Sequence, residues 1–114
     1  MEPHFVIRDE ESRIEYNFIT SQGKDFFKWM EASDADTADA NIKKIRRRRD
    51  PRSFKISIKT LNAGDKFYFC ACDEEGQELF CSLLYSSLQR VKGGREFLVR
   101  EMYEARIYDM SVRG

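Results

Sequence analysis

Two related stretches of sequence decide the fold: YNFITSQGKDFF at residues 16–27 and FCACDEEGQELF at residues 69–80. They align when the chain is shifted by 53 residues, and Gly23 then falls on Gly76. Each stretch holds an alternating apolar segment, a polar turn that ends in glycine, and a second apolar segment, which is typical of two strands joined by a turn. A repeat at this spacing predicts two similar structural units.

Each predicted hairpin is followed by a predicted helix. The first helix should begin at Ser33 or Asp34, whose side chains can accept N–H groups of the first turn, and it should end before Pro51. The second should begin after Ser87. Apolar residues at helical spacing form the inward faces, namely Ala35, Ala38, Ile42 and Ile45 in the first helix and Leu88, Val91, Leu98 and Met102 in the second.

Two glycines stand in the middle of the second predicted helix. Gly93 and Gly94 each cost about 1 kcal/mol relative to alanine in a helix interior. We therefore expect a close approach of the helix to the sheet at this point, where a side chain would not fit.

The composition fits a single folded domain. The chain has 114 residues, with 20 Lys and Arg against 20 Asp and Glu, and 41% hydrophobic residues supply a core. This excludes a disordered chain and gives no overall electrostatic attraction to nucleic acid. We predict one domain, residues 1–114, made of two repeats at about 1–53 and 54–114, with further strands at 54–59 and 105–112.

The second half resembles a known family. It contains Lys66, Phe67, Tyr68 and Phe69, then Gly76, Ser82, Tyr85, Ser87 and Gly94. This spacing resembles that of the YegP-like family of small bacterial proteins, which consist of tandem strand-strand-strand-helix-strand repeats. The first half departs from the pattern, with Trp29, Ala32, Asp34 and Asn41 in the places of Ser82, Tyr85, Ser87 and Gly94.

The resemblance implies an architecture and no activity. It implies an α+β fold in which two repeats form one antiparallel sheet with both helices on one face. The strand after each helix would then be exchanged into the partner unit.

The three cysteines, Cys70, Cys72 and Cys81, predict neither a disulfide nor a metal site. Cys70 and Cys72 share one strand face about 7 Å apart, farther than a disulfide prefers. The chain has no pair of CxxC motifs and only one histidine, His4, so a zinc site is not expected. We expect reduced cysteines and a cytoplasmic protein.

The predicted sheet face opposite the helices is unusually apolar. Its anchors for binding would be four aromatic residues, Phe27, Trp29, Tyr68 and Phe80. An exposed apolar face commonly marks an interaction surface, here for a protein partner or a second copy, and aromatic residues can also stack on nucleic-acid bases. The alternative is a strand register shifted by one residue.

A basic run suggests the other function, nucleic-acid binding. It comprises Lys43, Lys44, Arg46, Arg47, Arg48, Arg49 and Arg52. These residues could contact several phosphates, and they also suit a solvated helix end, where the helix dipole favours positive charge.

Catalysis, cofactors and membrane insertion are not expected. The acidic clusters at residues 9–11 and 73–75 resemble exposed turns, where nothing would tune a pKa for general acid or base chemistry. Ser82, Ser86 and Ser87 have no histidine in a recognisable arrangement. No apolar stretch approaches the ~20 residues of a membrane span.

Overall fold

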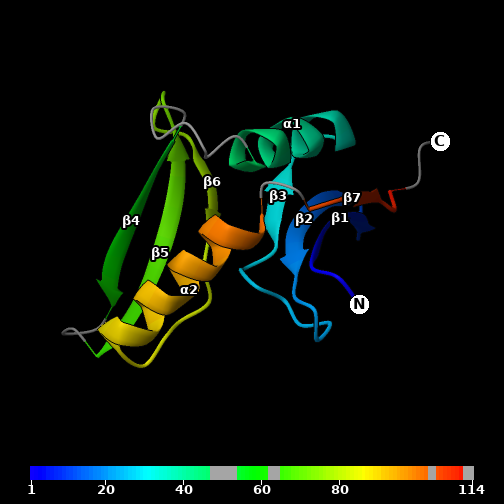
Figure 1. Cartoon of the computed structure of the whole chain (residues 1–114). Helices are drawn as coiled ribbons and strands as arrows, with labels where there is room; N and C mark the ends of the chain where they lie inside the picture. Colours follow the sequence, from blue (N-terminus) through cyan, green and yellow to red (C-terminus); the bar gives the residue numbers. More distant parts are fainter. Residues whose placement is uncertain (47–53, 62–64, 103–104, 112–114) are drawn as a thin grey trace.

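The computed structural model describes residues 1–46, 54–61, 65–102 and 105–111. Three strands and a helix occur twice along the chain, and a last strand follows (Figure 1). In order the elements are β1 (His4–Glu10), β2 (Arg13–Ile19), β3 (Met30–Ala32), α1 (Ala35–Arg46), β4 (Phe54–Leu61), β5 (Lys66–Asp73), β6 (Glu78–Cys81), α2 (Leu88–Glu101) and β7 (Ile107–Asp109).

The predicted turns and helix starts are confirmed. Gly23 and Gly76 have φ angles of 76° and 83°, in the left-handed region that glycine adopts without strain. Asp34 caps α1, because its carboxylate accepts the Thr37 N–H at 2.7 Å. The hydroxyl and N–H of Thr37 hold the pKa of Asp34 below its ordinary value. The Ser87 hydroxyl caps α2 by accepting the Arg90 N–H at 3.1 Å.

The strands form two sheets, so the prediction of one antiparallel sheet is wrong. One sheet has four strands in the order β3-β2-β1-β7, and the other has three in the order β4-β5-β6. β1 and β7 run parallel, with Phe5 paired to Ile107, and the other strand pairs are antiparallel. A single bridge between Phe27 and Ser82 links the region between β2 and β3 to the end of β6.

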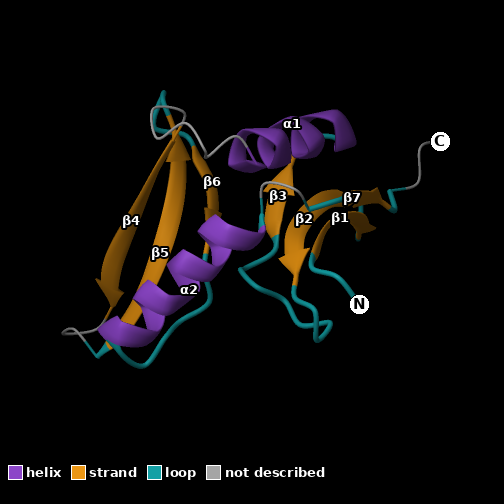
Figure 2. Ribbon diagram, viewed as in Figure 1, coloured by secondary structure: helices purple, strands orange, loops and turns teal. Residues whose placement is uncertain are grey.

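Each helix packs mainly against its own sheet (Figure 2). α1 contacts β1, β2 and β3 and also reaches β6, whereas α2 contacts β4 and β5. Both helices were predicted to cover one face of a single sheet. The structure instead has two sheets, and each helix packs mainly against one of them. Neither helix of the described chain is long and apolar enough to cross a membrane.

Both sheets and both helices contribute to one core. Its buried members include Phe5, Ile7, Tyr16, Phe18, Phe27, Ala38, Ile42, Ile45, Phe69, Ala71, Leu79, Phe80, Val91 and Met102. The predicted inward faces are confirmed at Ala38, Ile42, Ile45, Val91 and Met102. Leu88, predicted to point inward, is 44% exposed because it opens the first turn of α2.

The residues that carry the family resemblance hold α2 and its hairpin in place. The Ser82 hydroxyl accepts the Phe69 N–H at 2.9 Å, and Tyr85 exchanges two backbone hydrogen bonds with Phe67. A Cβ added at Gly94 would lie 2.8 Å from Cζ of Tyr85. A close approach is thus present at Gly94, but to Tyr85 in the segment between β6 and α2 and not to a strand of the sheet as predicted. A Cβ added at Gly93 would meet nothing within 4 Å.

Candidate functional site

Two of the four predicted aromatic anchors are core residues. Phe27 and Phe80 are fully buried and stack on each other with ring centroids 4.6 Å apart. Phe80 is the cross-strand partner of Ala71, and cross-strand partners lie on the same face of a sheet. Because Ala71 belongs to the core, Phe80 does too, and the prediction that Phe27 and Phe80 are exposed is wrong.

Asn17 explains why Phe27 turns inward. Its amide donates to the Phe27 carbonyl at 2.8 Å, and its side-chain carbonyl accepts the Phe27 N–H at 3.2 Å. The buried Asn17 side chain thus makes the two hydrogen bonds to Phe27 that the backbone of a neighbouring strand would otherwise make. Simple alternation along residues 24–29 does not apply, since this segment is not a regular strand.

The other two predicted anchors are partly exposed but do not share a surface. Trp29 lies beside the four-stranded sheet, with the Arg8 guanidinium 3.5 Å from its ring centroid and its indole N–H donating to Asp25 at 2.9 Å. Tyr68 lies on β5 of the other sheet, opposite Lys59. The predicted four-residue binding face is therefore not assembled.

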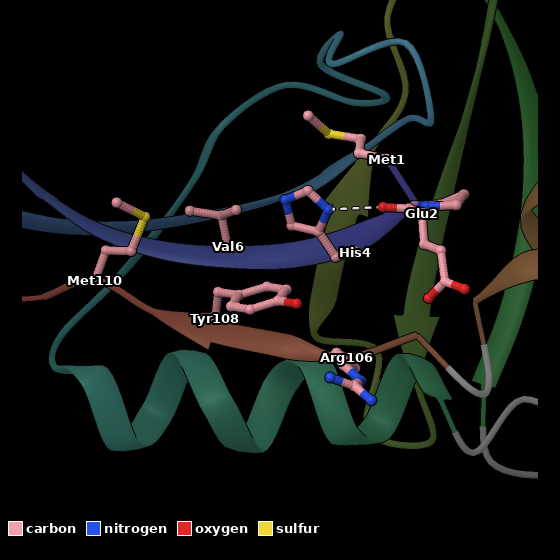
Figure 3. A pocket seen from close by; sticks show the side chains of 8 residues that line it. Met1, Glu2, His4, Val6, Arg106, Tyr108 and Met110 are labelled. Atoms are coloured by element: carbon pink, nitrogen blue, oxygen red, sulfur yellow. Dashed lines mark hydrogen bonds between the residues drawn. The ribbon is translucent and has the colours of Figure 1, made fainter.

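A groove lies on the four-stranded sheet and is a candidate binding site. It has a volume of about 640 Å³. It is lined by Met1, Glu2, Pro3, His4, Val6, Arg106, Tyr108 and Met110. Figure 3 shows these side chains gathered over β1 and β7. We call this site the β1/β7 groove.

The strand registers explain why these side chains face the groove. Phe5 and Ile7 of β1 point into the core, so His4 and Val6 point to the opposite face. Val6 pairs with Tyr108, which therefore lies on the same face. The alternation in residues 4–10 would have indicated β1, but nothing local shows that residues 106–110 lie next to it.

Most of the groove surface is apolar, and its polar groups lie near one end. The His4 ring contacts Tyr108 edge-on, with centroids 5.0 Å apart, and its Nδ1 lies 2.9 Å from the Glu2 carbonyl oxygen. Arg106 is exposed at the same end (Figure 3). A smaller cavity of about 350 Å³ shares Glu2, Pro3 and Arg106 and is also lined by Arg100 and Glu101. The arrangement suits an apolar ligand that carries polar or charged groups.

The predicted basic run is only partly described. Lys43 forms an ion pair with Asp39 at 2.8 Å, and Lys44 forms one with Asp73 at 3.2 Å. Arg46 ends α1. The other members, Arg47, Arg48, Arg49 and Arg52, lie outside the described residues. Nucleic-acid binding by this run stays a prediction, and Lys43 and Lys44 already have acidic partners within the chain.

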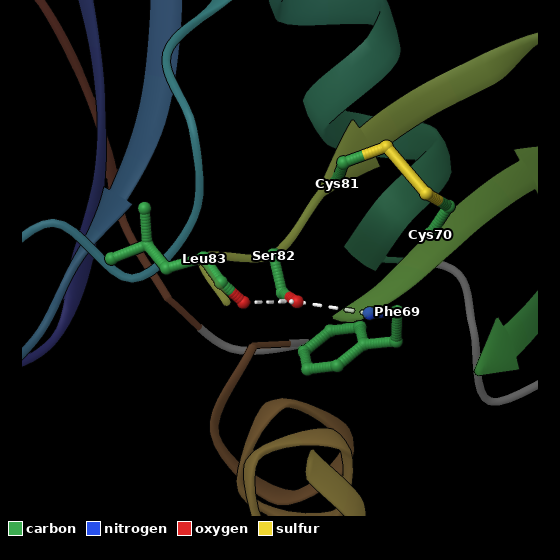
Figure 4. The surroundings of a disulfide bond; sticks show 5 residues. All are labelled: Phe69, Cys70, Cys81, Ser82 and Leu83. Carbon is green, nitrogen blue, oxygen red and sulfur yellow. Dashed lines mark hydrogen bonds between the residues drawn. A yellow bond between two sulfur atoms is a disulfide. The ribbon is translucent and has the colours of Figure 1, made fainter. Parts of the chain in front are cut away.

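Cys70 and Cys81 form a disulfide, which corrects the expectation of reduced cysteines (Figure 4). The two residues are cross-strand partners in β5 and β6, with Cα atoms 4.2 Å apart. The strand spacing counts only against a Cys70–Cys72 pair, and Cys72 remains free. Regular pairing across the turn at Gly76 would have put Phe80 opposite Cys70, and an irregularity between Ala71 and Cys72 brings Cys81 there instead. The cytoplasmic prediction loses the support it took from reduced cysteines.

Comparison with known proteins identifies the fold. No protein-family model and no curated protein matches the sequence. The solution NMR structure of yegP from E. coli, described as a protein of unknown function, matches with a TM-score of 0.82 and 16% identity over 100% of this chain and 97% of that chain. The solution NMR structure of a UPF0339 protein from Shewanella oneidensis matches with a TM-score of 0.83 and 14% identity, over 97% and 93%.

These similarities extend over almost the full length of all three chains. At 16% and 14% sequence identity, these structural similarities establish the fold of the chain but not its activity. The chain therefore has the fold of the YegP-like proteins, as the residues Ser82, Tyr85, Ser87 and Gly94 predict.

Proposed function

We propose that the protein is a non-catalytic binding module that holds an apolar segment of a partner protein in the β1/β7 groove. The observation that carries this proposal is the exposure of large apolar side chains at one place. Tyr108 is 48% exposed, Met110 69% and Met1 77%, and all three line the groove. Contiguous exposed apolar surface of this kind commonly marks an interaction site.

The residue types favour a protein segment. Tyrosine provides a large contact area with few rotatable bonds and is enriched at binding hot spots. Methionine is flexible and polarizable, so Met1 and Met110 can adapt to different apolar side chains. Arg106 and Glu2 near one end could pair with charges on the same segment. This proposal moves the interaction surface from the predicted anchors Phe27, Trp29, Tyr68 and Phe80 to β1 and β7 of the four-stranded sheet.

The test uses a phage library of random peptides, with the protein immobilised through an added C-terminal tag. Peptides selected by the wild-type protein are labelled, and their affinities are measured by fluorescence anisotropy. Tyr108→Ala should weaken binding at least about tenfold, as expected for a hot-spot residue. Leu84→Ala is the matched control, because Leu84 is 47% exposed but does not line the groove.

NMR locates the bound peptide independently of any substitution. We expect amide shift changes concentrated at residues 4–8 and 106–110. Changes centred on β4 and β5, or equal losses in Tyr108→Ala and Leu84→Ala, would contradict the proposal. The other possible occupant of the groove is a second copy of the protein, and sedimentation equilibrium of the free protein tests this. If the protein self-associates through the groove, Tyr108→Ala should abolish the association.

A further inference from the structure

The β5–β6 hairpin brings three potential metal ligands together. Cys70 and Cys81 face each other across the two strands, and Glu78 lies three residues before Cys81. The two sulfur atoms and a carboxylate oxygen of Glu78 all lie within 4.8 Å of one another. This cluster lies on the three-stranded sheet, so it is independent of the β1/β7 groove.

An irregularity in strand pairing places Glu78 on the cysteine face. Residues three apart in a regular strand point to opposite faces, which would separate Glu78 from Cys81. Here Ala71 pairs with Phe80 but Cys72 pairs with Glu78, so Leu79 is an extra residue on β6. The extra residue reverses the alternation, as a β-bulge does. Glu78 and Cys81 consequently share a face with Cys70.

The cluster is accessible from one side. Cys70 is buried, Cys81 is partly exposed and Glu78 is exposed. An ion can therefore reach the sulfur atoms from the Glu78 side, while Cys70 supplies a ligand that is shielded from water. Shielding strengthens the electrostatic attraction between a thiolate and a cation.

We propose that reduction of the Cys70–Cys81 disulfide creates a binding site for Zn²⁺ or a cation of similar softness. Two molecules of a small thiol reduce the disulfide, giving two cysteine thiols and one small-molecule disulfide. Zn²⁺ then displaces the two thiol protons and binds both sulfur atoms and the Glu78 carboxylate. Water completes the four ligands. The same two cysteines thus alternate between a covalent crosslink and a metal site.

The donor atoms and their spacing suit zinc. Zinc binds cysteine sulfur at about 2.3 Å and carboxylate oxygen at about 2.0–2.2 Å in a tetrahedron, which places two sulfur ligands about 3.8 Å apart. The three ligand atoms lie within 4.8 Å of one another, so small side-chain movements suffice once the S–S bond is broken. Ca²⁺ and Mg²⁺ prefer sites made only of oxygen. The usual spacing rules miss this site, because its ligands come from two facing strands and a bulge.

The experiment compares zinc binding by reduced and oxidised wild-type protein. The protein is reduced with a phosphine, exchanged into metal-free buffer without oxygen, and titrated with Zn²⁺ against a chromophoric chelator. We expect one Zn²⁺ per reduced chain, release of up to two protons, and no binding at this site in the oxidised chain. X-ray absorption should show two sulfur ligands. Co²⁺ substitution should give sulfur-to-metal charge-transfer absorption.

Two variants identify the ligands. Glu78→Gln removes the carboxylate while keeping its shape. Loss of a residue that only supports a metal ligand typically weakens binding about 10–100-fold. Loss of the ligand Glu78 itself should weaken zinc binding by at least this factor. Glu75→Gln is the matched control, because Glu75 is an exposed carboxylate in the turn of the same hairpin but outside the cluster. It should bind zinc like the wild type. Circular dichroism of every variant verifies folding.

Each outcome decides the proposal. Reduced wild-type protein that binds zinc no better than the oxidised protein would overturn it. Unchanged affinity in Glu78→Gln, or lost affinity in Glu75→Gln, would overturn the assigned ligand set. Cys70→Ser and Cys81→Ser should each abolish binding, but the test does not depend on them, since the comparison of reduced with oxidised wild type needs no substitution.

Discussion

Phe27 and Phe80 stack with their ring planes inclined by 24°, although they lie in different halves of the chain. The backbone bridge between Phe27 and Ser82 is two residues away from Phe80, so the stack sits where the two sheets meet. The two rings are therefore part of what joins the halves into one core.

Replacing either ring should destabilise the protein strongly. Phe27→Ala and Phe80→Ala should each lower the free energy of unfolding by about 3–5 kcal/mol, the usual cost of removing a buried phenylalanine. The double variant should reveal a coupling of about 0.5–1.5 kcal/mol from the aromatic pair. Urea denaturation of the wild type, the two single variants and the double variant measures these free energies of unfolding. Phe27→Ala with unchanged stability would show that Phe27 is a surface residue after all.

The buried Asn17 side chain should also be essential for stability. Asn17→Ala leaves the N–H and carbonyl of Phe27 without this partner, and each unsatisfied buried group costs about 1–3 kcal/mol. Thr20→Ala is the control, because Thr20 also accepts two backbone N–H groups but in an exposed turn. Urea denaturation should show a clearly larger loss for Asn17→Ala, and equal losses would contradict this role.

The two adjacent glycines of α2 should respond in opposite directions to alanine. Gly94→Ala forces a Cβ against the Tyr85 ring, and such overpacking costs about 1–3 kcal/mol. Gly93→Ala adds a methyl group in open space and should stabilise the helix by up to about 1 kcal/mol. Thermal unfolding of the two variants beside the wild type provides the comparison. A similar shift in both would mean that α2 does not approach Tyr85 this closely.

Stability should fall at high pH because of Tyr16. Burial raises the pKa of Tyr16 to about 12, and the negative charge of Glu78 adds to the increase. A hydrogen bond with Asn41 has the opposite, smaller effect on this pKa. Between the ordinary value of 10.0 and about 12, the unfolded chain loses this proton while the folded chain keeps it. The stabilisation is therefore complete below pH 10 and decreases above it, by about 2–3 kcal/mol in all.

The Tyr16 contribution is isolated by comparison with Tyr16→Phe. Urea denaturation at several pH values from 9 to about 12 should give a steeper decline for the wild type than for the variant. Parallel curves would show that other groups cause the decline, among them Tyr85, whose pKa burial also raises.

The basic run predicts a salt-dependent affinity for nucleic acid. Anisotropy of labelled oligonucleotides at about 50 and 200 mM salt should show a log-log slope of about −0.7 per phosphate contact for single strands and −0.9 for duplex DNA. Replacing Arg46, Arg47, Arg48 and Arg49 by glutamine should abolish binding. Lys92→Gln is the control on α2. No binding at the lower salt, or binding that survives the fourfold replacement, would exclude this function.

Features determined by neighbouring residues could be predicted from the sequence. The turns at Gly23 and Gly76 and the caps Asp34 and Ser87 depend on a few adjacent positions. Features that depend on distant pairing could not. The Tyr108 side chain faces the groove because β7 pairs with β1, and Glu78 joins the cysteines because of a bulge. Burial of Phe27 depends on a hydrogen-bonding side chain that alternation ignores.

The parallel pairing of β1 with β7 has a consequence for how the chain folds. Phe5 finds its partner Ile107 only after residues 6–106 have been synthesised. The β1 edge of the β1–β2 hairpin therefore stays unpaired until β7 has left the ribosome. Closing so long a loop costs entropy before any contact compensates for it, and distant contacts slow folding. The four-stranded sheet should be the slower of the two to form.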